Sequence, residues 1–518
     1  MTSGIHHLTA ITRKIQANVD FYVGFLGLRL VKRTAGFEDA QQLHLFYGDG
    51  AATPGSLVTF LAWEDGSLGR VGHGASSEIS FAVDREAIGF WLTRALQCNV
   101  KMTGPTQEFG EPVLRLTDPD GIIVKLVGVD DYGDWVWWKD GGIAEADAIR
   151  GIRGATILSE KADETAAFLE RHTGFVAGAV EGAIRRLVSE SGQIIDVRNA
   201  GGFWTAAPGT GTIDHVAVRA SSQEAVDALH KALQAEDAGD INVHDRHYFY
   251  SLYVREPGGT LIEVATDDPG FTADETVEAL GTGFFIPKHY KADHEALKVM
   301  LPQFGLPGEE RVIYRELPFV HRIHMPESWD GSTLVLLHGS GTNETAMLPL
   351  GRKVAPNSML IGLRGRSTDE GSPRFFRRFD QTTFDQKEIA SEVDAFVAFI
   401  EDIGPAYGVD PERLTFLGYS NGGNMLAATM QLRPDAIRKA VMLRSMNVLE
   451  ERPVVDLSGT QVLSLSAIDD FYGPLAGELE DRLKAGGAQL TAKVLDANHG
   501  LGGEDEVIVR GWLQERVA

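Results

Sequence analysis

The chain has 518 residues, of which 43% are hydrophobic and 23% are charged. This length exceeds what one hydrophobic core supports, so two or more domains are expected, and the composition argues against long disordered segments. The 48 Lys and Arg against 73 Asp and Glu give a net charge of -25, which disfavours nucleic acid and anionic membranes as partners. The single cysteine excludes an internal disulfide framework. The sequence has no apolar run of the roughly 18 residues that a membrane span needs and no signal-peptide core, so a cytoplasmic protein is expected.

A repeat organises residues 1–270. Gly4–Ile11 is similar to Thr212–Val218 and, more weakly, to Gly151–Ile157. A second element also recurs, a Pro/Gly turn followed by an alternating strand, at Asp118–Lys125 and Glu256–Glu263. Helical patterns lie between the two elements. The pattern therefore predicts four α+β units of one strand, one helix and several strands, whose paired sheets curve around a cleft. The units begin near Gly4, Gly74, Gly151 and Thr212.

The character of the chain changes near Gly305–Glu310, a Gly/Pro/acidic stretch that suits a linker. Beyond it, apolar strands such as Thr333–Leu337 and Leu414–Leu417 alternate with helical segments such as Ile389–Ile400. This alternation indicates an α/β domain with a mostly parallel sheet. Residues 271–304 are assigned to the first domain as an extension. The predicted boundaries are 1–304 for the first domain, 305–310 for the linker and 311–518 for the second domain.

Each predicted unit offers one cleft-facing position in its first strand and one in its last. Taken in order, the four units hold His7 and Thr59, Glu78 and Lys125, Gly154 and Asp196, and His215 and Glu263. Only the first and fourth units together supply two histidines and a carboxylate, with one position vacant. This is the ligand set of non-haem Fe(II) oxygenases, whereas a fourth protein ligand would favour a glyoxalase-like isomerase. A charged Lys125 cannot bind a metal, so it is expected to pair with Glu78.

Several short segments around these positions have a characteristic sequence. They are His6–Thr9, Asp214–His215, Asp245–Phe249, Tyr253 and Leu261–Thr266. They resemble the vicinal oxygen chelate superfamily, and within it the ring-cleaving dioxygenases that act on hydroquinones rather than catechols. The resemblance implies four βαβββ modules and O2 as co-substrate. It implies Fe(II), with Mn(II) as the second choice, held by His7, His215 and Glu263.

The resemblance also implies roles around the substrate for His6, Thr9, Arg246 and Tyr253. A guanidinium and a phenolic hydroxyl suit the negative charge that builds on dioxygen and a deprotonated phenol, and a histidine can accept the phenolic proton. One departure is Asp214, a candidate substrate-binding residue that stands where this family commonly has a second histidine. The substituent preference and the second proton-transfer partner therefore stay open.

A nucleophile motif lies in the second domain. Gly418–Gly422 fits the G-x-S-x-G elbow between a strand and an apolar helical run, which is the context that the motif requires. Ser420 is the predicted nucleophile, His499 the base and Asp470 the acid, with Asp469 as the runner-up. This chain order is that of α/β-hydrolases. The list of predicted catalytic groups is completed by the backbone N–H groups of Ser340 and Asn421, which would form an oxyanion hole.

Residues 311–518 resemble the phospholipase/carboxylesterase group of the α/β-hydrolase fold over nearly their whole length. The stretch Arg374–Asp380 also resembles the substrate-side loop of esterases that bacteria pair with quinone-responsive dioxygenases. Arg374 and Arg377 are therefore candidates to bind a substrate carboxylate, and a solvated basic loop is an equally consistent reading.

Two functions from different classes follow. In the first, a bifunctional enzyme opens a small aromatic diol with O2 and then hydrolyses the ring-opened product as an ester or at a C–C bond. In the second, a non-catalytic aromatic-binding domain is attached to a carboxylesterase. A third reading, a glyoxalase-like isomerase fused to an esterase, needs a fourth protein ligand that the sequence does not supply. The superfamily often associates, so a homo-oligomer is a further expectation; ring substituents and transfer of product between sites stay open.

Overall fold

The protein is described here by a computed structural model, which covers residues 4–236, 239 and 241–515. The chain divides into two compact units, one of Met1–Ala292 with Phe304–Glu310 and one of Asp293–Gln303 with Arg311–Ala518. Each unit has its own sheets and core. Among the described residues, every helix is too short or too polar to serve as a membrane span.

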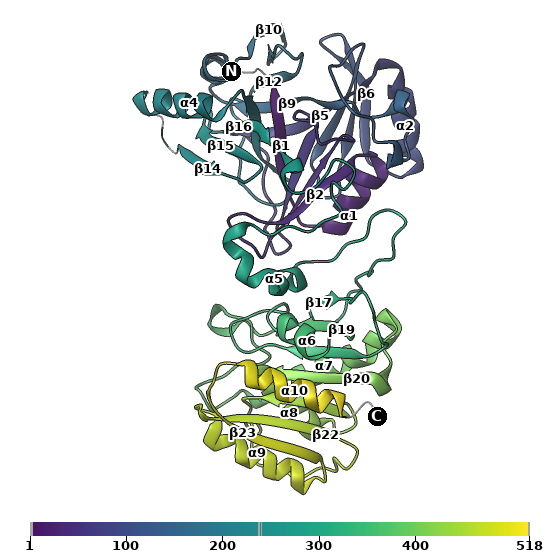
Figure 1. The fold of residues 1–518 in the computed structure, drawn as a ribbon, viewed down its shortest axis with the longest axis vertical. Coiled ribbons are helices and arrows are strands. Elements are labelled where there is room, and N and C mark those ends of the chain that lie inside the picture. The colour runs from purple at the N-terminus through teal and green to yellow at the C-terminus, as the bar shows by residue number, and fades with distance from the viewer. Residues whose placement is uncertain (1–3, 237–238, 240, 516–518) are drawn as a thin grey trace. The chain divides into compact units, whose positions relative to one another are not determined.

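Four repeated modules build the first unit (Figure 1). Each module has one strand, one helix and three further strands. The strands of the first two modules are β1 (Ile5–Thr12), β2 (Arg29–Ala35), β3 (Leu43–Gly48), β4 (Leu57–Ala62), β5 (Ala75–Asp84), β6 (Met102–Glu108), β7 (Glu111–Thr117) and β8 (Ile123–Val129). Those of the last two are β9 (Gly151–Ser159), β10 (Val176–Glu181), β11 (Ile184–Val188), β12 (Ile194–Asn199), β13 (Ile213–Ala220), β14 (Asn242–Asp245), β15 (Phe249–Arg255) and β16 (Leu261–Pro269). The helices are α1 (Ile15–Val19), α2 (Ile88–Gln97), α3 (Ala162–His172) and α4 (Gln223–Ala235). The predicted fourfold α+β architecture is confirmed.

The modules pair into two eight-stranded sheets. The first and fourth modules share the sheet β14-β15-β16-β13-β1-β4-β3-β2, and the second and third share β10-β11-β12-β9-β5-β8-β7-β6. In the first sheet, Thr9 of β1 lies opposite His215 of β13, and Ala217 of β13 lies opposite Glu263 of β16. This register brings the predicted ligand positions of three neighbouring strands to one level of the sheet, because alternate residues of a strand share a face.

The second sheet has the same register with different side chains. Ser80 lies opposite Lys125, and Thr156 lies opposite Asp196. The Lys125 side chain is 2% exposed, and its ammonium lies 3.5 Å from Glu78, 3.7 Å from Asp196 and 3.4 Å from Glu108. The expected Lys125–Glu78 pair is therefore present, and the position that corresponds to the candidate metal centre holds an ion-pair network.

The second unit is an α/β-hydrolase fold around a seven-stranded sheet. Its strands are β17 (His321–His324), β18 (Thr333–Leu337), β19 (Met359–Leu363), β20 (Leu414–Tyr419), β21 (Lys439–Leu443), β22 (Gln461–Asp469) and β23 (Gln489–Asn498). Their order is β17-β19-β18-β20-β21-β22-β23, and β17 alone of these seven runs antiparallel to its neighbour. The mostly parallel sheet predicted from the sequence is confirmed.

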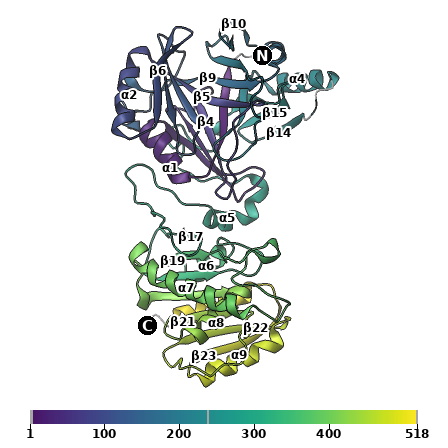
Figure 2. The same ribbon diagram turned by 180° about the vertical axis from the view of Figure 1, so that it is seen from behind.

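Helices cover both faces of this sheet. They are α5 (His294–Met300), α6 (Leu348–Val354), α7 (Gln386–Tyr407), α8 (Asn421–Leu432), α9 (Gly473–Ala485) and α10 (Gly503–Gln514). One core packs the sheet against α7, α8 and α9, and a second core packs the other face against α6 and α10. Figure 1 shows α10 in front of the sheet, and Figure 2, from behind, shows α7 and α8.

The predicted boundary between the domains differs from the structure at two places. Residues 293–303 belong to the second unit, because α5 packs on α6 and Val299 is buried in the same core as Leu336 and Leu348. The predicted linker 305–310 instead packs on the first unit. There Gly305 and the Gln16 side chain exchange two hydrogen bonds of 2.9 and 3.0 Å.

Candidate metal centre and serine nucleophile

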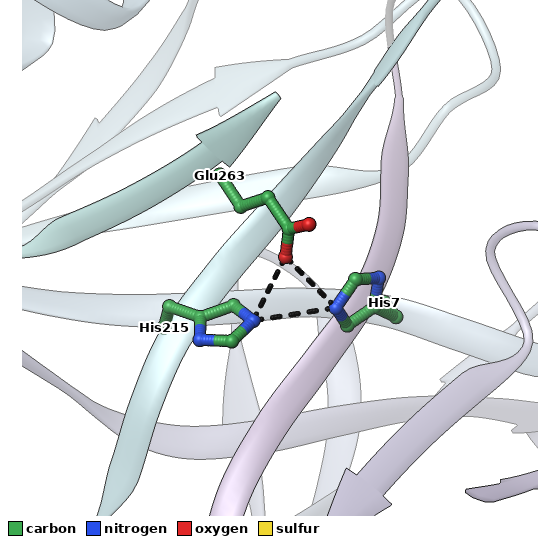
Figure 3. Close-up of side chains that lie close together, drawn as sticks. All are labelled: His7, His215 and Glu263. Carbon is green, nitrogen blue, oxygen red and sulfur yellow. Dashed lines mark hydrogen bonds and ion pairs between the residues drawn. The ribbon is translucent and has the colours of Figure 1, made fainter. Parts of the chain in front are cut away.

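Three side chains from neighbouring strands converge in the first sheet (Figure 3). The Nε2 atoms of His7 and His215 lie 3.3 Å apart, and they lie 3.1 and 2.9 Å from Oε2 of Glu263. All three residues are buried, and their ligand atoms lie within 4.8 Å of one another. The structure thus brings together the three residues that the resemblance implies as metal ligands.

This donor set fits a divalent transition metal. The Glu263 carboxylate is fully buried, and neither of its oxygens has a well-aligned hydrogen-bond donor. Burial alone would raise the pKa of this carboxyl, but the neighbouring His7 and His215 hold it well below its ordinary value. A buried carboxylate needs a compensating charge. A cation between two imidazole nitrogens and one carboxylate oxygen would supply it, in the arrangement typical of non-haem Fe(II).

The Nδ1 atoms of His7 and His215 also have neighbouring side chains as partners. His215 Nδ1 donates to Asp214 Oδ2 at 2.7 Å. Although burial opposes it, this bond and Glu263 raise the pKa of His215 to about 9. His7 Nδ1 lies 2.8 Å from Nδ1 of His6, whose pKa burial and His7 lower to about 3. Neutral His6 can therefore accept a hydrogen bond from His7. Both Asp214 and His6, predicted beside the substrate, contact a ligand histidine directly.

A cavity of about 750 Å³ lies in front of this cluster. His7 and His215 reach its wall, together with four of the residues predicted around the substrate, Thr9, Asp214, Arg246 and Tyr253. Its apolar wall includes Phe37, Phe46, Trp63, Phe249 and Phe285. The size and the aromatic lining suit a small aromatic ligand, because such sites are mostly apolar with a few placed polar groups.

Tyr253 and Arg246 form one side of the cavity. Tyr253 lies directly across from Glu263 in the β15–β16 pair. Burial and the Glu263 charge raise the pKa of its phenol well above the ordinary value, so the phenol keeps its proton as a donor. The Arg246 guanidinium lies 5.3 Å from the Tyr253 ring centre and donates from Nη1 to Glu38 at 2.6 Å.

The fourth repeat-equivalent position, beside those of His7, His215 and Glu263, is Thr59, whose side chain is a neutral hydroxyl. Thr59 Oγ1 lies 3.0 Å from Thr9 Oγ1 and 2.9 Å from Nε2 of His44. Thr59 is thus engaged in hydrogen bonds with two residues of the cavity wall. Among the described residues, the cluster offers three candidate ligands rather than the four that a glyoxalase-like isomerase would use.

Two histidines that line the cavity were not predicted from the sequence, His44 on β3 and His244 on β14. Burial and His7 lower the pKa of His44 to about 3, so it is a neutral group in the wall. The His244 ring centre lies 5.7 Å from that of Tyr253. Both histidines lie on middle strands, whereas the repeated positions that predict the site lie on the first and last strand of each unit. The alternation of residues in His44–Phe46 was the one sequence signal for a cavity-facing side chain there.

In the second unit, Ser420 lies at a sharp turn between β20 and α8, with φ of 52°. Glycines make this turn possible: a Cβ at Gly418 would lie 2.5 Å from the Gly422 carbonyl oxygen, and one at Gly422 would lie 2.3 Å from that of Leu337. The strained backbone is typical of a nucleophile elbow.

The remaining members of the predicted triad lie beside this serine. His499 Nε2 is 3.0 Å from Ser420 Oγ, and His499 Nδ1 is 2.8 Å from Asp470 Oδ1. Asp470 is buried, whereas Asp469 is exposed at the end of β22. The structure therefore places Asp470, not the runner-up Asp469, against the imidazole.

Two loops surround the elbow. His338 accepts the Gly365 N–H at Nε2 (3.0 Å), so its Nδ1–H donates to the Gly339 carbonyl at 2.6 Å. This histidine fixes the loop that carries Ser340. On the other side, the Phe375 N–H donates to Oδ1 of Asn421 at 2.7 Å.

The structure separates the two arginines that were predicted to bind substrate together. Arg374 is buried and donates from Nη1 to Ser340 Oγ at 2.9 Å. The Arg377 side chain is 51% exposed and pairs with Asp369 at 3.4 Å. It lies in an open surface depression with Asp385 and Glu388. The exposed Arg377 agrees with the alternative of a solvated basic loop, and its role in substrate binding stays a prediction.

Comparison with known proteins agrees with these observations. The profile of the Glyoxalase/Bleomycin resistance protein/Dioxygenase superfamily matches residues 4–126. The Bacillus subtilis protein named "Putative ring-cleaving dioxygenase MhqO" is 37% identical over 312 residues, which are 60% of this chain and 98% of that protein. The chlorohydroquinone/hydroquinone 1,2-dioxygenase of Sphingobium indicum is 30% identical over 292 residues, 54% of this chain and 89% of that protein.

A solved structure is also similar to part of the chain. The crystal structure of a carboxylesterase from Mesorhizobium loti is 38% identical and covers 40% of this chain and 99% of its own, with a TM-score of 0.38. The family is shown by the first unit, to which nearly the whole length of both dioxygenase relatives aligns. Through this unit, the chain belongs to the ring-cleaving dioxygenase family of the glyoxalase/dioxygenase superfamily.

Proposed function

We propose that the chain is a bifunctional enzyme, in which an Fe(II)-dependent dioxygenase cleaves substituted hydroquinones and a serine esterase acts on the ring-opened product. The observation that carries the proposal is the buried His7–His215–Glu263 cluster at the wall of a 750 Å³ aromatic-lined cavity. Thr59 adds no fourth ligand, which leaves positions for a phenolic oxygen and O2. The hydroquinone specificity of the Sphingobium indicum relative supports this substrate class.

His7, His215 and Glu263 would hold the iron, which would supply Lewis-acid and redox chemistry for the reaction of the diol with O2. The chain's own residues bind, orient and shield the substrate. The aromatic wall packs on the ring and excludes water, which strengthens electrostatic interactions. The protonated Tyr253 phenol and the Arg246 guanidinium face the negative charge that develops on oxygen. Thr9 and His44 line the cavity and are joined through Thr59 by hydrogen bonds, which hold both side chains in place.

The second unit would hydrolyse an ester by the serine mechanism. His499 Nε2 takes the proton of Ser420 as Oγ attacks the carbonyl carbon, and buried Asp470 orients the imidazole. The backbone N–H groups of Ser340 and Asn421 would stabilise the oxyanion. Cleavage of a ring beside an alkoxy-bearing carbon yields an ester, which links the two activities chemically.

Oxygen uptake by anaerobically Fe(II)-loaded protein tests the first activity. Methyl-, methoxy- and chlorohydroquinone are offered beside catechol, with His215→Ala as the control. Uptake with a hydroquinone that the variant loses supports the dioxygenase. Iron retention without uptake would favour an aromatic-binding module attached to an esterase.

The coupling of the two activities needs a separate measurement. The products that wild type and Ser420→Ala form from methoxyhydroquinone are compared by mass spectrometry. The variant should accumulate the ester that wild type converts to an acid and methanol. Identical final products from both would contradict the coupling.

A further inference from the structure

His244 faces the cavity from the edge strand β14. In the β14–β15 ladder Asn242 lies opposite Tyr253 and His244 lies opposite Ser251. Cross-strand partners share one face of a sheet, and Tyr253 in turn lies opposite Glu263. The His244 side chain is therefore on the face of the sheet that holds the candidate metal ligands, and it lines the same cavity.

The Tyr253 ring separates His244 from the metal-ligand cluster. Its centre lies 5.5 Å from the ring centre of His215 and 5.7 Å from that of His244, and both contacts are edge-on. In the sheet order β15 lies between β14 on one side and the ligand strands β16 and β13 on the other, so the two histidines flank the phenol ring. His244 thus lies one aromatic ring beyond a candidate metal ligand.

His244 differs in its partners from the two other histidines of the wall that are not candidate ligands. His44 Nε2 is hydrogen-bonded to Thr59, and His247 Nε2 is hydrogen-bonded to Asp274 at 3.1 Å. Within the part of the chain that the structure describes, the ring nitrogens of His244 make no hydrogen bond. Of these three imidazoles, His244 is the one whose nitrogens are available to a substrate.

A carboxylate and a guanidinium set the state of this imidazole. Glu38 Oε1 lies 3.8 Å from Nδ1 of His244 and accepts the 2.6 Å hydrogen bond of Arg246. Burial and the positive charge of Arg246 lower the pKa of His244, so its ring is neutral near pH 7. The carboxylate on the Nδ1 side favours the proton on that nitrogen, which leaves Nε2 as the acceptor.

We propose that Nε2 of His244 binds the second hydroxyl of the substrate, para to the oxygen at the metal-ligand cluster, and accepts its proton during ring cleavage. The two hydroxyls of a hydroquinone lie at opposite ends of one ring, which matches the one-ring separation between the cluster and His244. Asp214 is committed to His215, so His244 supplies the second proton-transfer partner that the sequence left open. The inference deepens the proposed function and rests on it.

The proton is returned at the end of the reaction. Its loss makes the electron pair of the second oxygen available to the ring, which is oxidised as O2 is reduced. Both atoms of O2 enter the product, and the bond between the carbon of the first hydroxyl and its neighbour breaks to give a carboxyl and a carbonyl group. His244 then returns the proton to the second oxygen, which ends as an enol. One diol and one O2 thus give one ring-opened acid, and the imidazole is neutral again.

Binding without turnover tests the contact. Calorimetry on the oxygen-free, Fe(II)-loaded full chain gives Kd for hydroquinone and for 4-methoxyphenol, in which a methyl group replaces the proton of the second hydroxyl. Wild type should bind hydroquinone about five- to tenfold more tightly, since only this ligand donates to Nε2. His244→Leu should bring the ratio close to one, whereas His244→Gln should keep most of it, because an amide oxygen still accepts. Equal affinities in wild type would overturn the inference.

Oxygen uptake with hydroquinone tests the proton transfer. Both variants should lower kcat about 100-fold, because neither leucine nor glutamine can take up the proton. His230→Gln is the matched control and should keep the wild-type kcat, since His230 lies on α4 of the same module and bonds to Gln234. A wild-type kcat in His244→Gln would overturn the proton transfer. No uptake by wild type would overturn the proposed dioxygenase and the proton transfer together, while the calorimetry still decides the contact.

Discussion

His215 Nδ1 donates a 2.7 Å hydrogen bond to Asp214 Oδ2, its neighbour in the chain. With Nδ1 held by this bond, Nε2 is the ring nitrogen turned toward Glu263 and His7. A carboxylate behind a ligand histidine fixes the ring and strengthens it as a metal ligand. This contact gives Asp214, which departs from the family pattern, a structural role: it supports a candidate metal ligand.

Asp214→Ala should lower the affinity for Fe(II) by about 10- to 100-fold. The measurement is iron transfer from the loaded protein to a colorimetric chelator, which does not depend on turnover. Asp227→Ala is the control, because it removes a carboxylate that accepts a hydrogen bond from Tyr250 on the same unit. Equal transfer from the two variants would contradict the supporting role.

Replacement of the two adjacent acids of the second unit should separate their roles. Asp470→Asn should lower kcat for ester hydrolysis by about 10⁴-fold, because it favours the wrong histidine tautomer. Asp469→Asn should stay within about twofold of wild type, since a surface change of this kind is nearly neutral. Kinetics with 4-nitrophenyl acetate check both. A large loss in Asp469→Asn alone would mean that the acid is assigned to the wrong residue.

The stability of the first unit should depend on Asp118. Burial raises the pKa of its carboxyl to about 6 from an ordinary 3.8, against two backbone N–H donors. The folded state therefore favours the protonated carboxyl. Stability from this group is present below pH 3.8 and is lost as the pH rises through about 6.

Asp118→Asn keeps the shape without the charge, so it should stabilise the protein at pH 8 by up to about 3 kcal/mol. At pH 4 most of this gain should be gone. Urea unfolding of dilute wild type and variant, followed by fluorescence at both pH values, measures the difference. The same gain at pH 4 and pH 8 would contradict the titration of this carboxyl.

Lys125 should be essential to the stability of the second sheet. Its removal leaves Glu78, Glu108 and Asp196 close together without their shared ammonium. Lys125→Met is expected to cost about 1–3 kcal/mol, because the carboxylates lose one buried donor while Arg115 and Arg186 still pair with them. Denaturant unfolding measures it, with exposed Lys101→Met as the control. A loss no larger than that of the control would show that the network contributes little.

Much of the fold was predictable because its signals are local. Turn residues and alternating strands recur at matching places in the four modules, and the strand–G-x-S-x-G–helix pattern needs only adjacent residues. The repeat also brought out His7, His215 and Glu263. Equivalent positions in equivalent modules face one cleft. The repeat therefore predicted that these three side chains lie close together, although they are far apart in the sequence.

Features that depend on the packing of distant segments could not be predicted from these local signals. Asp469 and Asp470 are equivalent in sequence, and only the turn after β22 decides which one is buried against His499. Arg374 and Arg377 lie three residues apart on one loop, and only the path of that loop decides that the first is buried and the second is exposed. The helix α5 was assigned to the wrong unit because its apolar stripe does not say which core it completes.

The sequence by itself determined the two folds, the order of the modules and the residue types of both candidate sites, because hydrophobic period, turn chemistry and repeated positions act over a few residues. Only the tertiary structure decided that Asp214 and His6 hold the ligand histidines, that His44 and His244 line the cavity, and that Arg374 lies beside Ser340. These relations depend on strand register, loop path and burial, which arise when segments far apart in the chain pack together.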